Sequence, residues 1–208
     1  TEIYTLSLHD ALPIWGQKSG FVFPNLNNGW VSGSEPINDF VYLFRSADIG
    51  VNWVLQDISL PDDAIGAMFE SLPPVFFSAA EAVLPLRAYL PDGEMRTLFY
   101  RSTDGGETWT FLNGVLPPAN HFVFVDSENW WLLGESSLFR TRDGGTGWED
   151  LSGALPAGFI PLNLDFTDAN NGWMLVSPAG DVEYESNYLF HSADGGASWE
   201  LLPAQITQ

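Results

Sequence analysis

Short apolar runs recur along the chain and alternate with polar turn residues. Four runs rich in β-branched and aromatic residues each end at a basic residue: "VYLFR" (Val41 to Arg45), "TLFYR" (Thr97 to Arg101), "SLFR" (Ser137 to Arg140) and "YLFH" (Tyr188 to His191). Runs of this length and composition, bounded by Gly, Asn and Asp, are typical of β-strands. A second short apolar run follows each of them, as in "WVLQ", "WTFL", "WEDL" and "WELL". The pattern predicts an all-β chain built from antiparallel hairpins.

Between the two runs of each hairpin lies one repeated motif. It appears as "SADIGVNW", "STDGGETW", "TRDGGTGW" and "SADGGASW", beginning at residues 46, 102, 141 and 192. Each copy has Ser or Thr, then Asp two residues later, Gly four later and Trp seven later. Ser and Asp accept hydrogen bonds from the backbone of a turn, and Gly adopts positive φ without steric cost. Because Ile49 replaces the first of the two glycines, we expect only the second glycine to be required. A motif copied four times indicates a fold element rather than an active site. The predicted structural residues are Ser46, Asp48, Gly50, Trp53, Ser102, Asp104, Gly106, Trp109, Thr141, Asp143, Gly145, Trp148, Ser192, Asp194, Gly196 and Trp199.

A second motif precedes three of the boxes. "FPNLNNGW", "FVDSENWW" and "FTDANNGW" begin at Phe23, Phe124 and Phe166, and they read as strand, tight turn and strand. In the second repeat, "FSAAEAVL" from Phe77 keeps only the Phe of this motif. Each repeat therefore holds four strands. Four antiparallel strands every 40 to 50 residues or so are typical of a β-propeller blade.

The paired motifs resemble the Asp-box, or BNR, repeats of sialidases, xyloglucanases, sortilin-type receptors and photosystem II assembly-factor-like propellers. The pairing of "NNGW" with "LF.S.DGG..W" is most similar to the last group, over Phe21 to Pro203. The resemblance implies a ring of six to eight blades, of which residues 15–208 supply four as one propeller region. The expected blades span about residues 20–60, 75–115, 120–153 and 160–203. The resemblance also implies a non-catalytic protein that works outside the cytoplasm, in the periplasm, on the cell surface or secreted.

The opening segment, Thr1 to Ile14, shares neither motif. "TEIYTLSLHDALPI" is identical to one reading frame of a common sequencing adapter, so we interpret it as non-native and exclude it from fold reasoning. The native sequence is then expected to begin near Trp15, as a fragment of a larger propeller.

Composition narrows the classes of function. Seven Lys and Arg residues face 27 Asp and Glu residues, for a net charge of −20. Such a surface repels phosphate backbones, which argues against nucleic-acid binding. The chain has no Cys, so it has no disulfide and no thiolate metal site. No apolar run reaches the roughly 20 residues of a membrane-spanning helix.

Candidate chemistry outside the boxes is sparse. A sialidase needs three arginines around the substrate carboxylate and a Tyr paired with a Glu. Here Arg45, Arg101 and Arg140 precede boxes as scaffold residues and Arg142 lies inside a box, which leaves Arg87 and Arg96. Carboxylates outside the boxes could serve a glycosidase or a weak calcium site, but spacing assigns no pair and no ligand set. We therefore predict no catalytic residue, no metal ligand and no cofactor.

Three loops fall outside the repeat and are the predicted binding surface. The first, Pro61 to Pro74, is expected to hold a short helix; the others are Leu90 to Glu94 and Ser177 to Asn187. Their candidate binding residues are Asp62, Asp63, Asp92, Glu94, Asp181, Glu183 and Tyr184. The preferred function is a non-catalytic binding or assembly scaffold with a protein or carbohydrate partner. The alternative is a fragment of a sialidase- or xyloglucanase-like glycoside hydrolase whose catalytic residues lie partly in other blades.

Overall fold

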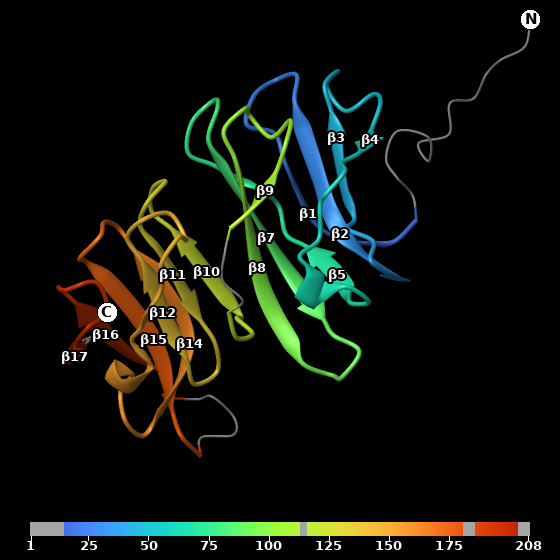
Figure 1. Ribbon diagram of the computed structural model, residues 1–208. Coiled ribbons are helices and arrows are strands. Elements are labelled where there is room, and N and C mark those ends of the chain that lie inside the picture. Colours follow the sequence, from blue (N-terminus) through green and yellow to red (C-terminus); the bar gives the residue numbers. More distant parts are fainter. Residues whose placement is uncertain (1–14, 113–115, 181–185, 204–208) are drawn as a thin grey trace, which may run out of the picture. The chain divides into compact units, whose positions relative to one another are not determined.

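The computed structural model describes residues 15–112, 116–180 and 186–203. The segment 1–14 and three of the predicted binding residues, Asp181, Glu183 and Tyr184, lie outside the described residues. The chain divides into two compact units, residues 1–116 and 117–208 (Figure 1). Each unit is described by itself.

The described chain is all-β, and its strand pairings are antiparallel. Each box motif lies between the third and fourth strands of its repeat, as the hydrophobic pattern predicted. Within the described residues two short 3-10 helices interrupt the strands, η1 (Asp62–Ala64) and η2 (Ser152–Ala154). Repeat 1 comprises β1 (Gln17–Val22), β2 (Gly29–Asn38), β3 (Leu43–Ser46) and β4 (Val54–Leu55). Repeat 2 comprises β6 (Val75–Phe76), β7 (Ala82–Tyr89), β8 (Met95–Ser102) and β9 (Thr110–Phe111).

The second unit contains two separate four-stranded sheets. Repeat 3 is β10 (His121–Phe124), β11 (Trp130–Leu133), β12 (Leu138–Thr141) and β13 (Glu149–Asp150), which pair in chain order. Repeat 4 is β14 (Phe159–Phe166), β15 (Gly172–Pro178), β16 (Tyr188–Ser192) and β17 (Glu200–Leu201), again in chain order. In this half of the chain each repeat forms its own sheet.

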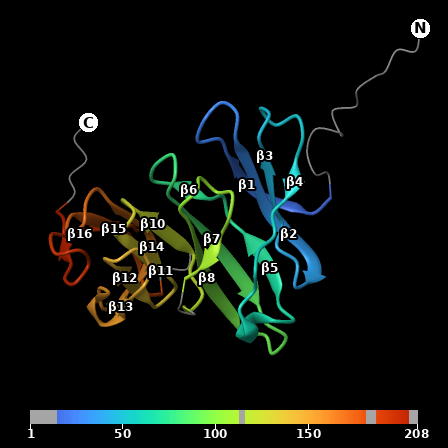
Figure 2. The same ribbon diagram turned by 45° about the horizontal axis from the view of Figure 1, so that its top comes forward.

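In the first unit the expectation of separate four-stranded blades is wrong. Strand β5 (Met68–Ser71) pairs with the far end of β2 and with the far end of β7, so repeats 1 and 2 share one nine-stranded sheet. Figure 2 shows β5 and β6 along β7. Strands β5 and β6 are two halves of one strand, broken at Pro73 and Pro74, which have no N–H to donate to a ladder. The loop before β5 contains the expected short helix, the three-residue η1.

The first turn of repeat 2 is better preserved than its sequence indicates. The Ser78 hydroxyl accepts hydrogen bonds from the N–H groups of Ala80 (3.2 Å) and Glu81 (2.9 Å). Asn25, Asp126 and Asp168 accept the same pair of bonds in the other three repeats. The Phe of this motif is therefore Phe76, two residues before Ser78, and the alignment on Phe77 was shifted by one residue.

Each unit has its own core between two repeats. In the first unit, buried Trp30, Leu84, Tyr100 and Trp109 belong to one apolar cluster drawn from both repeats. In the second unit, Trp131, Leu138, Phe166 and Met174 do the same for repeats 3 and 4. Burial is continuous rather than alternating in the inner strands β2, β7, β8 and β11, each of which has at least four consecutive buried residues.

Candidate functional site

The four box motifs form the same hydrogen-bonded turn. The hydroxyl of the leading Ser or Thr donates to the Asp carboxylate at 2.7–2.9 Å and accepts from the N–H of the second glycine at 2.8–3.0 Å. The Asp carboxylate also accepts the backbone N–H four residues later, at 2.8–2.9 Å. The turn is thus closed by side chains at fixed local spacing.

A further bond joins each box to the first turn of its own repeat. The N–H of the fourth box residue donates to a carbonyl of that turn, at 2.8–3.0 Å in all four repeats. The donors are Ile49, Gly105, Gly144 and Gly195, and the acceptors are Asn27, Ala80, Glu128 and Asn170. This network uses the Asp residues as turn-closing acceptors within the scaffold.

Hydrogen bonding keeps the box carboxylates ionised. The pKa of Asp104 falls from an ordinary value of 3.8 to about 2, first because the Thr108 hydroxyl and N–H donate to it. Hydrogen bonds also lower the pKa of Asp48, Asp143 and Asp194, led by those from Asn52, Gly147 and Ser198 respectively. A carboxylic acid that stays ionised at neutral pH cannot serve as a general acid.

Both glycine positions of the box have positive φ, and the expectation that only the second glycine is required stays a prediction. The fourth box position has positive φ in all four copies, at Ile49 (65°), Gly105 (74°), Gly144 (68°) and Gly195 (75°). A β-branched side chain is strained in this conformation. Ile49 therefore tolerates the turn at a cost, and its side chain is 70% exposed.

The box Trp residues lie against the repeats at different depths. Trp109 is 7% exposed, whereas Trp53, Trp148 and Trp199 are half-buried. None of the four stands on an open surface. They serve as packing residues of the turn.

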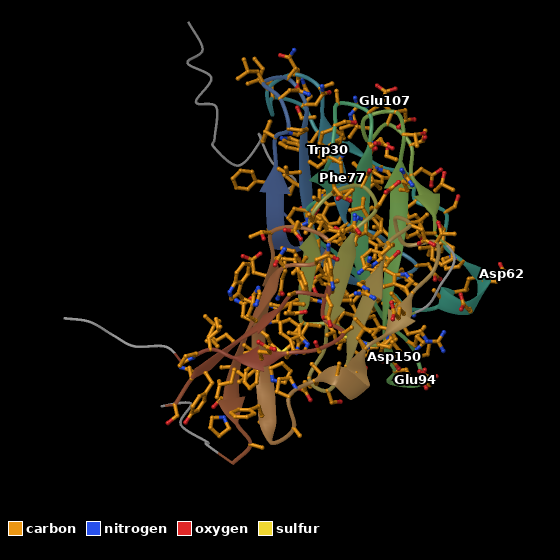
Figure 3. The ribbon with its side chains drawn as sticks, turned by 90° about the vertical axis from the view of Figure 1, so that its left-hand side faces the viewer. Trp30, Asp62, Phe77, Glu94, Glu107 and Asp150 are labelled. Carbon is orange, nitrogen blue, oxygen red and sulfur yellow. The ribbon has the colours of Figure 1, made fainter. Side chains whose placement is uncertain are left out.

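Two of the three predicted binding loops come together at one end of the first unit. Arg96 donates to Glu94 at 3.2 Å and lies 3.6 Å from Asp63, so it links the η1 loop with the hairpin between β7 and β8. Figure 3 shows the Asp62 and Glu94 carboxylates at the end of this unit away from Glu107. Asp62, Asp63, Asp92 and Glu94 are all exposed. These loops therefore form a single acidic rim, defined here by Asp62, Asp63, Asp92 and Glu94.

A cleft lies at the strand ends that lead to this rim. It has a volume of about 650 Å³ and is lined by Gly16, Gln17, Ser34, Glu35, Pro36, Met68, Phe69, Glu70 and Tyr89. Met68 and Tyr89 are paired across β5 and β7 and are 42% and 40% exposed. We call this space the Glu70 cleft.

Glu70 is the best-connected polar group of the cleft. Its carboxylate accepts hydrogen bonds from the Ser19 hydroxyl (2.8 Å), Arg87 (3.0 Å) and the Tyr89 hydroxyl (3.4 Å). Burial alone would raise the pKa of Glu70, but the bonds from Ser19 and Arg87 and the charge of Arg87 outweigh it, and the pKa is lowered. Burial and the Glu70 charge raise the pKa of Tyr89. At neutral pH the pair is therefore an anion beside a neutral phenol.

Sequence reasoning missed Glu70 and its partners. The signal available in the sequence was that the repeat pattern assigns no scaffold role to Arg87 and Arg96. Both form ion pairs with carboxylates, as do the pre-box arginines Arg45, Arg101 and Arg140. Each of these five guanidinium groups already has a carboxylate partner within the protein.

Among the residues that the structure describes, no group of three or more His, Asp or Glu side chains could hold a metal ion. In the same residues no helix has the length and hydropathy needed to cross a membrane.

The geometry defines the class as an all-β protein of Asp-box repeats. No family model matches the chain, and no curated protein matches it either. Among solved structures it is similar to a YCF48 bound to a D1 peptide, with 17% identity over 91% of this chain and 83% of that one and a TM-score of 0.48. It is similar to YCF48 from Cyanidioschyzon merolae, with 14% identity over 92% and 86% of the two chains and a TM-score of 0.45. It is also similar to a Trypanosoma rangeli sialidase in complex with 2,3-difluorosialic acid, with 14% identity over 80% and 30% and a TM-score of 0.46. The structural resemblance is thus to YCF48 and to sialidase β-propellers. At these identities and TM-scores it transfers no residue role to this chain.

Proposed function

We propose that the chain is a non-catalytic binding or assembly scaffold that holds a segment of a partner protein in the Glu70 cleft. The observation that carries this proposal is the cleft itself: about 650 Å³ with apolar walls and few polar groups. Clefts of 300 to 1,000 Å³ or so with this mixture are the usual form of a binding site. Met68 and Tyr89 offer exposed apolar surface at its edge.

Charge indicates what kind of segment fits. Glu35 and Glu70 line the cleft, and the acidic rim continues from the ends of β5 and β7. The whole chain carries a net charge of −20. A segment that combines apolar residues with Lys or Arg is complementary to such a surface and is attracted to it over a distance. Its association should weaken as salt is added.

A hydrolase is the second candidate because Tyr89, Glu70 and Arg87 lie within hydrogen-bonding distance. The raised pKa of Tyr89 makes it a poor nucleophile at neutral pH. Arg87 is already paired with Glu70 and has less charge to offer a substrate carboxylate. The geometry therefore supports binding better than turnover.

Peptide display on the intact chain tests the proposal. A random-peptide library should yield binders rich in basic and apolar residues. Met68→Lys should weaken those peptides at least about tenfold, because it places a positive charge at the cleft edge. Leu26→Lys is the matched control, since Leu26 is also an exposed apolar residue of this unit but belongs neither to the cleft nor to the acidic rim. Peptides that bind both variants equally would contradict the proposal.

Enzyme assays separate the two candidates. We expect no turnover of aryl-sialoside or xyloglucan. Turnover that disappears in Tyr89→Phe or Glu70→Gln would favour the hydrolase.

Two finer expectations belong to the same proposal. The repeats are proposed to act as four-stranded blades of a six- to eight-bladed ring, and the protein to work outside the cytoplasm. Both are supported by the box motifs and the resemblance they carry. Fractionation of cells expressing the tagged full-length gene tests the location, since recovery with cytoplasmic markers would contradict it.

A further inference from the structure

Each unit joins its two repeats through the same aromatic contact. In the first unit, Trp30 of repeat 1 lies on Phe76 of repeat 2, with ring centroids 4.8 Å apart. In the second unit, Trp131 of repeat 3 stacks on Phe166 of repeat 4 at 3.8 Å. Each unit contains both sides of its own contact, so the surroundings of the two contacts can be compared position by position.

Two arginines lie beside this contact in the second unit. Arg140 of repeat 3 donates through Nη1 to the carbonyls of Asp194 (2.8 Å) and Gly195 (2.9 Å) in the box of repeat 4. Glu149 accepts from the Nη2 of the same guanidinium at 2.6 Å. A Cβ placed on Gly195 would lie 2.5 Å from Arg140 and 3.0 Å from Arg142, so both guanidinium groups reach this turn. The backbone of a box can thus bind a guanidinium.

Arg45, the equivalent of Arg140 in repeat 1, has a different partner. Its guanidinium donates to the Glu107 carboxylate of the next box at 3.1 Å. Glu107 stands where repeat 4 has Ala197, and the cross-strand partner of Arg45 is Val54, which has no carboxylate. Arg45 therefore binds a side chain of the next box, whereas Arg140 binds its backbone.

A groove of about 630 Å³ lies between repeats 1 and 2. Ala47 stands where repeat 3 has Arg142, so the second guanidinium has no counterpart here. Among the residues that the structure describes, no donor is hydrogen-bonded to the carbonyls of Asp104 and Gly105, the equivalents of the two that Arg140 binds. We call this space the Gly105 groove; its lining includes Asn28, Arg45, Phe76, Phe77, Asp104 and Glu107.

The lining of the groove indicates the chemistry of its ligand. The carboxylates of Asp104 and Glu107 outnumber the one guanidinium of Arg45, which favours a cation. Phe76 and Phe77 are half-buried aromatic residues of the wall. A planar guanidinium can lie against aromatic rings and donate in a fork to adjacent oxygens, whereas an ammonium is a compact point charge. Arginine therefore fits the groove better than lysine.

We propose that the Gly105 groove binds an arginine side chain of a partner protein, which donates to the carbonyls of Asp104 and Gly105. Arg140 shows the same interaction inside the second unit. The groove shares no lining residue with the Glu70 cleft. Figure 3 shows Phe77 and Glu107 at the end of the first unit away from Asp62 and Glu94. The site is therefore independent of the function proposed for the cleft.

Titration of the intact chain with N-acetyl-arginine amide, followed by NMR, tests the proposal. Binding should saturate with a Kd of about 1 mM, as expected for a ligand of this size, and should shift the Gly105 amide signal. The lysine analogue and the uncharged citrulline analogue should each bind at least about tenfold more weakly. Work at about 0.15 M salt screens the general attraction of cations to the acidic chain.

Variants locate the binding in the groove. Ala47→Arg supplies an internal guanidinium, as Arg142 does in repeat 3, and should weaken binding of the arginine analogue at least about tenfold. Val51→Arg is the matched control, since it adds the same charge to the same box at an exposed residue outside the groove. It should leave the Kd unchanged. Met68→Lys, at the Glu70 cleft, should also leave it unchanged, so the two sites are tested separately.

Three outcomes overturn the inference: no saturable binding up to about 10 mM, equal binding of the arginine and lysine analogues, or unweakened binding by a folded Ala47→Arg variant. If Ala47→Arg does not fold, Glu107→Ala replaces it. That change copies Ala197 of repeat 4 and removes the carboxylate that holds Arg45, so Arg45 is free to bind the carbonyls itself. Unweakened binding by the folded Glu107→Ala variant would then count against the proposal.

Discussion

Replacing Ile49 with glycine should stabilise the first unit. Ile49 is one of two non-glycine residues with positive φ among the described residues, the other being Asp39. The equivalent position is glycine in the other three boxes. Its side chain is 70% exposed, so removing it loses little buried apolar surface. The turn bond from its N–H to the Asn27 carbonyl needs no side chain and is kept.

The magnitude follows from two opposing terms. A left-handed conformation costs an L-residue about 1–2 kcal/mol. Replacing Ile49 with glycine relieves this strain. Part of the relief is offset, because glycine makes the unfolded chain more flexible and ordering it costs about 0.5–1 kcal/mol. The net effect is a gain of about 0.5–1 kcal/mol in the free energy of unfolding. For a domain of roughly 100 residues this raises Tm by about 2–8 °C.

Urea unfolding of the dilute chain, followed by Trp fluorescence, measures the difference. Val51→Gly is the matched control, since Val51 is β-branched and 65% exposed but has no positive φ. It should lose about 0.5–1 kcal/mol. Ile49→Ala separates the Cβ effect from the side chain, and it should gain less than Ile49→Gly. Equal destabilisation by Ile49→Gly and Val51→Gly would refute the argument from backbone strain.

Further predictions concern the boxes. The Gly106→Ala variant should unfold at a lower urea concentration than Gly93→Ala. Both glycines have positive φ, but only at Gly106 would the new Cβ meet the Trp30 ring, at 2.6 Å, so the free energy of unfolding should fall by an additional 1–3 kcal/mol or so. Asp104→Ala should cost about 1–2 kcal/mol through lost turn bonds, whereas Asp62→Ala on the exposed rim should cost almost nothing. Since the pKa of Asp104 is lowered to about 2 in the folded chain, its stabilisation is present above pH 4 or so. It is lost as pH falls through the folded pKa, and a urea series from about pH 6 to 2 should show a shallower decline for Asp104→Asn.

The hydrogen bonds explain why the boxes could be read from sequence. Within each copy the bonds join residues two to four apart, as from Ser46 to Asp48 and Gly50. A turn closed by its own side chains depends on local spacing, so four copies of the spacing predict four copies of the turn. Ile49 shows the limit of this reasoning. An isoleucine in place of glycine suggested that the backbone at this position is unrestricted, whereas it has positive φ in all four copies.

Sequence alone determined the strand content, the four turns and the Trp residues that pack beside them, since these depend on residues close in the chain. Tertiary structure decided the rest. Ser19 reaches Glu70 across 51 residues, and Arg87 reaches it from a third strand, so the Glu70 cleft exists only once β1, β5 and β7 are assembled. The sharing of β5 by two repeats likewise followed from long-range pairing, in which the extended ends of β2 and β7 both had backbone groups to satisfy. Trp30, Trp131 and Trp173 are indistinguishable in the motif. Only the packing of one repeat on the next buries the first two and leaves the third half-buried.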